Sequence, residues 1–149
     1  MIKGTFLLRE ATREDCDLLF EWANDPIVRE NSFCKHSIGY EEHVKWFCCI
    51  LNNKEQKLYI LEKEGCPIGQ VRVRSIDNTA TISYSISPTN RGNGYGKLMI
   101  ELLKRRMVQE YPNIKTLVAE VKKDNIASKK VFKGNGFKEK CTVYELDLY

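Results

Sequence analysis

Residues 80–103 read ATISYSISPTNRGNGYGKLMIELL, and this stretch is the strongest indication of fold and function in the chain. Ala80–Ile86 alternates apolar and small polar side chains, as a half-buried β-strand does. Pro88–Gly96 is rich in turn-forming residues, and apolar side chains then recur at helical spacing from Leu98 to Met107. This order of strand, glycine-rich loop and helix can hold phosphate, because glycines let backbone N–H groups approach an anion and the first helical turn adds free N–H groups.

Spacing excludes the two commonest phosphate loops. A P-loop needs Ser or Thr directly after its lysine, whereas Lys97 is followed by Leu98, and no glycine stands five positions before Gly96. A dinucleotide fingerprint needs G-x-G-x-x-G on an early strand, whereas this chain has G-x-G-x-G late in the sequence. The remaining pattern is Arg-x-x-Gly-x-Gly, starting at Arg91. A tight turn without a ligand is the structural alternative.

The flanking sequence alternates between strand and helix patterns. Strands are expected at Phe6–Arg9, Lys57–Glu62, Pro67–Arg74, Ala80–Ile86 and Thr116–Val121, and as a closing pair at Phe137–Lys140 and Thr142–Leu148. Four helices are expected: one that begins after Thr12 and ends at Ala23, one at Glu41–Leu51, one after Gly96 and one at Ile126–Lys133. Residues 27–40 are expected to form a loop. These elements predict an α+β fold: a mixed, mostly antiparallel, twisted sheet of about seven strands flanked by about four helices, in a single domain over residues 1–149.

Composition narrows the class of protein. The chain has 149 residues, 42% of them hydrophobic and 30% charged, which is typical of one globular domain. No apolar run is long enough for a membrane span, and MIKGTFLLRE at the N-terminus lacks the apolar core of a secretory signal. We therefore expect a cytoplasmic protein.

The six cysteines favour neither disulfides nor a metal. No two cysteines have the C-x-x-C spacing, and the sequence has no closely spaced pair of histidines. We therefore expect no metal site. In a reducing compartment they are expected to be buried or semi-buried free thiols.

Charge is divided unevenly along the chain. The first fifty residues are net acidic, whereas residues 97–140 are net basic. The basic part suits a polyanionic small molecule or a nucleic acid, although on charge alone a solvated lysine-rich helix face is the favoured explanation. Aromatic residues do not interleave with the lysines as a base-stacking surface requires, so we expect no nucleic-acid partner.

Two motifs together resemble the GNAT superfamily of N-acetyltransferases. The first is Arg91–Gly96, and the second is the run NIASKKVFKGNGF from Asn125 to Phe137. The resemblance covers nearly the whole chain and implies acetyl-coenzyme A as co-substrate. It implies that the loop binds the pyrophosphate through backbone N–H groups, that Ile86 pairs with the pantetheine arm, and that Asn125 and Phe132 also touch the coenzyme. The expected coenzyme-binding residues are Ile86, Arg91, Gly92, Asn93, Gly94, Tyr95, Gly96, Lys97, Asn125 and Phe132.

Acetyl transfer to an amine needs a base and an acid. Glu120 is the first candidate base, because it stands between apolar residues of a predicted strand, where burial would raise the pKa of its carboxyl group. An edge-facing or ion-paired glutamate is the alternative, and Glu42 and His43 are weaker candidates. Many members of the family have a tyrosine where this chain has Phe132, so the acid has to be another group. Tyr84 is the leading substitute, and Tyr95, Tyr144 or solvent are the others.

The acceptor side is expected in the first third of the chain, at Trp22, Asn24, Arg29 and Trp46. The pattern W-x-N-D-x-x-V-R-x-x-S from Trp22 resembles nucleotide-sugar acetyltransferases that act on 4-amino sugars in pseudaminic acid-type pathways. It resembles ribosomal-protein N-terminal acetyltransferases more loosely. A UDP-sugar diphosphate would need Arg29, Lys35 or Arg72 as its partner.

Two other function classes are open at this point. One is a coenzyme-binding module without catalysis, and the other is a nucleic-acid binder that uses the basic second half. The tryptophans could also simply pack a helix pair.

The chain is expected to be a monomer or a homodimer, in which Thr142–Leu148 could pair across two copies.

Overall fold

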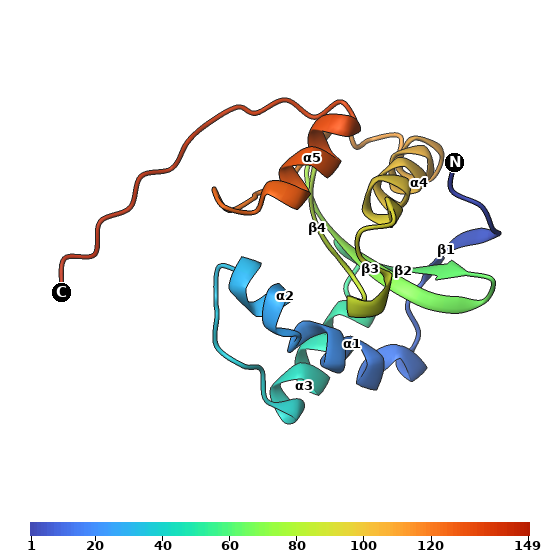
Figure 1. Ribbon diagram of the computed structural model, residues 1–149, viewed down its shortest axis with the longest axis horizontal. Coiled ribbons are helices and arrows are strands. Elements are labelled where there is room, and N and C mark those ends of the chain that lie inside the picture. The colour runs from blue at the N-terminus through green and yellow to red at the C-terminus, as the bar shows by residue number, and fades with distance from the viewer.

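The fold is built on one five-stranded sheet in the order β1-β2-β3-β4-β5. The computed structural model describes all 149 residues, and Figure 1 shows the arrangement of the elements. Pairing is antiparallel from β1 to β4, and β5 joins β4 in parallel. The strands are β1 (Phe6–Glu10), β2 (Gln56–Lys63), β3 (Cys66–Ile76), β4 (Thr79–Ile86) and β5 (Thr116–Val118).

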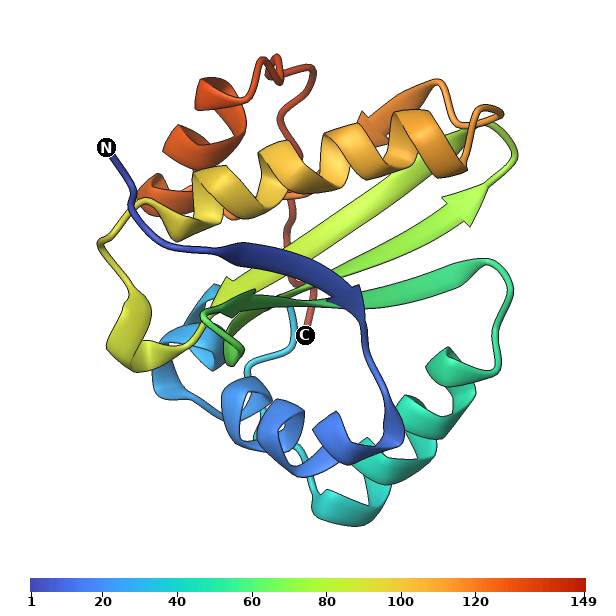
Figure 2. The same cartoon turned by 90° about the vertical axis from the view of Figure 1, so that its right-hand side faces the viewer.

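Helices cover both faces of the sheet (Figure 2). One face carries α1 (Cys16–Ala23), α2 (Pro26–Asn31) and α3 (Tyr40–Leu51), and the other carries α4 (Tyr95–Glu110) and α5 (Ile126–Gly134). Short 3-10 turns, η1 (Arg13–Asp15) and η2 (Pro88–Asn90), precede α1 and the glycine loop.

Strand β2 explains why the core has two parts. Its residues alternate between the faces, so Tyr59 and Leu61 join the larger apolar cluster with α4, whereas Leu58 and Ile60 join a smaller cluster with α1 and α3. A strand buried on both faces reads as a continuous apolar run. The result is an α+β fold with a mixed sheet, which confirms the predicted fold class.

The predicted count of elements is wrong at two places. There are five strands and not seven, because the two expected strands after Gly136 do not form. Strand β5 is also shorter than expected and ends at Val118. There are five α-helices and not four, because α2 occupies part of the predicted loop. Asp25 caps α2 by accepting a hydrogen bond from the N–H of Val28 at 3.2 Å, and Pro26 stands in its first turn. An acidic cap followed by proline is a helix start signal.

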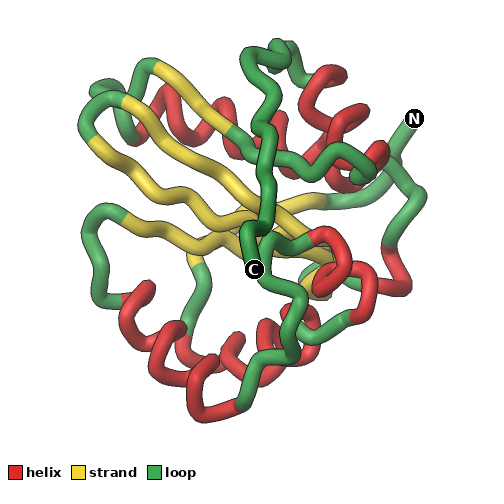
Figure 3. The backbone as a smooth tube through the Cα atoms, turned by 90° about the vertical axis from the view of Figure 1, so that its left-hand side faces the viewer, coloured by secondary structure: helices red, strands yellow, loops and turns green.

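The C-terminal arm, which we define as residues 138–149, contains no helix or strand. It leaves the body of the protein at the end of α5 and extends away from it (Figure 1), and it is loop along its whole length (Figure 3). Every residue of the arm is exposed, including its apolar side chains.

The cysteines are free thiols, but the predicted burial is wrong for five of them. Only Cys16 is half-buried, and Cys34, Cys48, Cys49, Cys66 and Cys141 are exposed. No group of three or more metal-ligating side chains is found. None of the helices combines the length and the apolar character that a membrane span requires.

Candidate active site

The glycine loop between β4 and α4 has the backbone conformation that only glycine adopts readily. Gly92 has φ +77° and Gly94 has φ +80°, and Gly94 is the residue that precedes the first turn of α4. A side chain at either position would be strained, because a Cβ atom disfavours positive φ. The sequence therefore needs glycine at these positions to bring the loop into the helix at this angle.

The loop presents a row of backbone donors. None of the N–H groups of residues 92–97 donates a hydrogen bond to a backbone carbonyl, and the first such donor after them is Leu98, whose N–H reaches Gly94 O at 3.2 Å. Six successive N–H groups at the positive end of a helix of 16 residues form an anion-binding concavity. This arrangement can hold a phosphate or pyrophosphate group.

Arg91 uses its side chain inside the protein. Its Nε donates to Ile86 O at 3.1 Å, and its Nη2 forms an ion pair with Asp25 at 2.5 Å. Burial raises the pKa of Asp25, but hydrogen bonds from Arg91 and from the N–H of Val28 outweigh this effect and lower the pKa below its ordinary value. The pair thus fixes the glycine loop to the turn between α1 and α2.

Replacing Asp25 by asparagine is expected to destabilise the protein by about 2 kcal/mol at neutral pH, because the ion pair is mostly shielded from water. Since the folded-state pKa of Asp25 is lowered, the stabilisation is complete above the ordinary value of 3.8 and is lost as the pH falls through the folded-state value. Melting temperatures of both proteins between pH 7 and pH 3 should therefore converge at acid pH. A gap that is constant over that range would exclude this role for the pair.

Helix α5 is held tightly against the start of α4. A Cβ atom at Gly96 would lie 3.2 Å from the Tyr84 ring and 3.3 Å from a methyl group of Val131, so glycine permits this close approach. The buried Asn135 side chain donates to the carbonyls of Lys97 and Val131, and so joins the two helices.

Two further predicted coenzyme-binding residues have structural contacts on α5. Asn125 caps the helix by accepting from the N–H of Ser128 at 3.1 Å. Phe132 is buried with edge-on contacts to Tyr84 and Phe137, at ring distances of 5.6 and 5.1 Å. Coenzyme contact by either residue stays a prediction.

Strands β4 and β5 separate at the middle of β4. Their parallel pairing ends at Thr81 and Val118, although β4 continues to Ile86. One backbone edge of residues 82–86 therefore has no strand partner beside the glycine loop. An extended chain can hydrogen-bond to such an edge as an added strand does, and Ile86 lies at its end.

Tyr84 lies next to this edge with its hydroxyl 3.1 Å from Ser128 Oγ. Burial raises the pKa of Tyr84, and the contact with Ser128 opposes this only in part. Its phenol group therefore keeps its proton at neutral pH, as a proton donor must.

Glu120 is exposed, and the prediction of a buried carboxylate inside a strand is wrong. Leu117, Ala119 and Val121 pack against the larger apolar cluster, whereas Glu120, which lies beyond the end of β5, does not belong to it. Water reaches the carboxylate there, so it is available to an incoming amine.

The sequence pattern around Trp22 serves mainly to hold the fold. Trp22 is buried in the smaller cluster, and the Asn24 side chain forms hydrogen bonds with both backbone polar groups of Ile38. Arg29 donates to the carbonyls of Ala23, Cys34 and His36, at 2.6, 3.0 and 3.3 Å. These residues position the loop after α2, and their contact with an acceptor stays a prediction.

Trp46 is partly exposed on α3, and the side chain of Arg72 from β3 packs over its ring. The Arg72 guanidinium is 5.7 Å from the centre of the indole ring. Burial and the nearby Arg74 lower the pKa of Arg72, and it takes part in no ion pair. A half-buried arginine without an acid is suited to an anionic ligand. The sequence signal is the alternation VRVR in β3, which puts an arginine on a sheet face.

His43 is a packing residue. It is buried between α1 and α3, where its Nε2 lies 2.9 Å from Cys16 O and its ring is parallel to Phe47. Glu42 is exposed on the same helix. Neither residue is tied to the glycine loop by a recorded contact.

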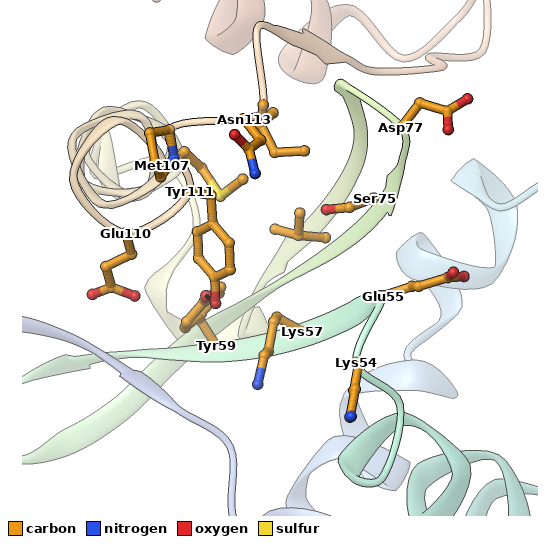
Figure 4. Close-up of a pocket in the computed structure, with 13 residues that line it drawn as sticks. Lys54, Glu55, Lys57, Tyr59, Ser75, Asp77, Met107, Glu110, Tyr111 and Asn113 are labelled. Atoms are coloured by element: carbon orange, nitrogen blue, oxygen red, sulfur yellow. Dashed lines mark hydrogen bonds between the residues drawn. The ribbon is translucent and has the colours of Figure 1, made fainter.

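One cavity lies away from the glycine loop. It has a volume of about 270 Å³ and is lined by the last turn of α4 and the ends of β2 and β3 (Figure 4). Tyr59 and Tyr111 meet beneath it, with their hydroxyl oxygens 3.3 Å apart. The glycine loop instead borders an open basin of about 500 Å³ that Lys3, Lys63 and Asn93 help to line.

The sequence matches one family profile over most of its length. Residues 5–138 match the acetyltransferase (GNAT) domain. No curated protein matches the chain.

Solved structures share this fold at low sequence identity. A domain from Methanocaldococcus jannaschii is 21% identical with a TM-score of 0.83, over 96% of this chain and 94% of its own. An aminoglycoside acetyltransferase in complex with coenzyme A is 18% identical with a TM-score of 0.81, over 93% and 87% of the two chains. Spermidine N-acetyltransferase from Vibrio cholerae, in complex with coenzyme A and spermine, is 18% identical with a TM-score of 0.81, over 91% and 82%.

Proposed function

The chain belongs to the GNAT family of acetyltransferases, and we propose that it moves the acetyl group of acetyl-coenzyme A to the amine of a nucleotide-linked 4-amino-deoxy sugar. In this proposal the N–H groups of residues 92–97 bind the pyrophosphate of the coenzyme. The free edge of β4 up to Ile86 binds the pantetheine arm and directs the thioester toward the sheet face that carries Glu120. The lysines Lys97, Lys129, Lys130 and Lys133 add positive charge near the coenzyme phosphates.

The chemistry is a direct attack of the amine on the thioester carbonyl. Glu120 takes a proton from the ammonium form of the acceptor, directly or through water, because only the neutral amine is nucleophilic. A backbone N–H near Ile86 polarises the carbonyl, and Tyr84 gives a proton to the departing coenzyme thiolate. The C–N bond forms as the C–S bond breaks, the new amide nitrogen then releases its extra proton to solvent, and Tyr84 regains a proton from solvent.

The unpaired Arg72 carries the assignment of the acceptor. A UDP-sugar brings two phosphates, so its site needs a cation with no other partner. Arg29 is occupied by backbone carbonyls, and Lys35 is paired with Glu30 at 2.8 Å. Arg72 remains, with the exposed part of Trp46 beside it as a surface for a sugar or a base. An acceptor that carries only positive charge would meet repulsion there.

Replacing Arg72 by glutamine is expected to raise KM for a UDP-4-amino-4,6-dideoxy sugar about ten-fold or more, because a charge-assisted hydrogen bond is lost. KM for acetyl-coenzyme A should stay unchanged. Steady-state kinetics with each substrate varied in turn measures both values. Arg74→Gln is the matched control, because Arg74 lies two residues away on β3 and is exposed. Equal effects of the two substitutions on the sugar KM would exclude the diphosphate role of Arg72.

A further inference from the structure

One face of the sheet carries a strip of polar side chains. The polar strip consists of three pairs of residues that face each other across β3 and β4: Gln70 and Ser85, Arg72 and Ser83, and Arg74 and Thr81. Gln70 also lies opposite Ile60 of β2, which packs against α1 and α3, so the strip lies on the sheet face of these helices. Ser83 and Thr81 are exposed, so the helices leave this part of the face open to a ligand.

Gln70 and Ser85 are hydrogen-bonded to each other and can still form further hydrogen bonds. Gln70 Nε2 donates to Ser85 Oγ at 3.1 Å. The Ser85 O–H is then free to donate, and Gln70 Oε1 is free to accept. No side-chain nitrogen or oxygen is buried without a partner, so Gln70 Oε1 reaches the surface. One donor beside one acceptor matches a hydroxyl group, which can accept and donate at the same time.

The position of this pair relates it to the proposed reaction. Ser85 directly precedes Ile86, where the thioester carbonyl is polarised in the proposed mechanism. Arg72 lies two residues from Gln70 on the same face, which is about 7 Å along a strand. A sugar whose phosphate binds Arg72 therefore reaches the pair with the part of its ring that is farthest from the phosphate. In a 4-amino sugar linked through carbon 1, that part carries the amine and the hydroxyl group on the neighbouring carbon.

We propose that Gln70 and Ser85 bind the hydroxyl group on the carbon next to the acceptor amine, and that they thereby select a vicinal amino alcohol. The hydroxyl group donates to Gln70 Oε1 and accepts from Ser85 Oγ. An acceptor without this hydroxyl group leaves both side chains desolvated and unpaired, which a binding site penalises strongly. This inference rests on the proposed function, because it places the acceptor between Arg72 and Ile86.

Two acceptors that differ by one oxygen atom test the inference. They are a UDP-4-amino-4,6-dideoxy sugar with a hydroxyl group on carbon 3 and the same sugar without it. The wild-type protein should prefer the first sugar by about 100-fold in kcat/KM. Gln70→Leu should lower this preference about ten-fold or more, because leucine has no hydrogen-bond acceptor. Thr81→Val is the matched control and should leave the preference unchanged, because Thr81 is exposed on the same face of β4 but lies opposite Arg74.

The ratio of the two kcat/KM values distinguishes recognition from a purely structural role. A substitution that only loosens the sheet lowers both values alike and leaves their ratio unchanged. Ser85→Ala should lower the ratio as well, and it tests the pair independently if circular dichroism shows that Gln70→Leu is unfolded.

Two results would overturn the inference while the proposed function stands. One is equal kcat/KM of the wild-type protein for the two sugars, and the other is a wild-type ratio in the folded variants of Gln70 and Ser85. Acetylation of neither sugar would contradict the proposed function itself, and the inference with it.

Discussion

Replacing Gly94 by valine is expected to weaken coenzyme A binding by about 100-fold, while the protein stays folded. Gly94 has φ +80°, and a β-branched residue in this conformation costs about 1–3 kcal/mol. The loop of the variant relaxes to negative φ, which turns away some of the N–H groups of residues 92–97. Binding of the pyrophosphate then has to restore the strained conformation. Isothermal titration calorimetry with coenzyme A measures the loss, and circular dichroism monitors the fold.

Gly39→Val is the matched control for that experiment. Gly39 also precedes a helix, but its φ is −72° and a Cβ atom there meets nothing within 4 Å. The control should bind coenzyme A as the wild-type protein does. Wild-type affinity in Gly94→Val would mean that the loop does not bind the pyrophosphate through its backbone.

Replacing Glu120 by glutamine is expected to lower kcat by about 100-fold, the effect typical of losing a general base. The side chain keeps its size and loses only the ability to accept a full proton. KM for acetyl-coenzyme A should change little, because in the proposed mechanism Glu120 contacts the acceptor amine and not the coenzyme. Steady-state kinetics at saturating acetyl-coenzyme A and acceptor measures kcat, and circular dichroism checks that the variant is folded.

Glu42→Gln is the control for the base, because Glu42 is an exposed glutamate on α3 at the acceptor side of the sheet. It should leave kcat unchanged. If Glu120→Gln keeps the wild-type kcat, Glu120 is not the base.

The sequence was most informative where backbone geometry constrains residue type. The glycine loop could be predicted because positive φ at Gly92 and Gly94 leaves few other choices. The alternation in Ala80–Ile86 located β4 for a similar reason, since one face of the strand is buried. Helix α2 carried a readable signal as well, but the Asn-Asp-Pro run was interpreted as the end of one helix and not as the start of the next.

The errors come from contacts that local patterns do not contain. The sequence did not indicate the role of Arg29 in the fold, where it donates to the carbonyls of Ala23 at the end of α1 and of Cys34 and His36 in the loop after α2; its contact with an acceptor stays a prediction. Glu120 looked buried because its neighbours are apolar, yet β5 ends two residues before it. The final strands were expected from alternation alone, which specifies a strand but not which sheet it joins.

In the most direct test of the proposed function, the protein is incubated with acetyl-coenzyme A, and mass spectrometry follows the release of coenzyme A and the mass of the product. This readout avoids thiol-reactive dyes, which the free cysteines would confuse. Three reactions are compared: a UDP-4-amino-4,6-dideoxy sugar, a pool of peptides with free N-termini, and no acceptor. We predict one acetyl group on the amine of the sugar, with release of coenzyme A above the acceptor-free rate. Acetylated peptides with an unmodified sugar, or no product from either acceptor, would contradict the proposed function.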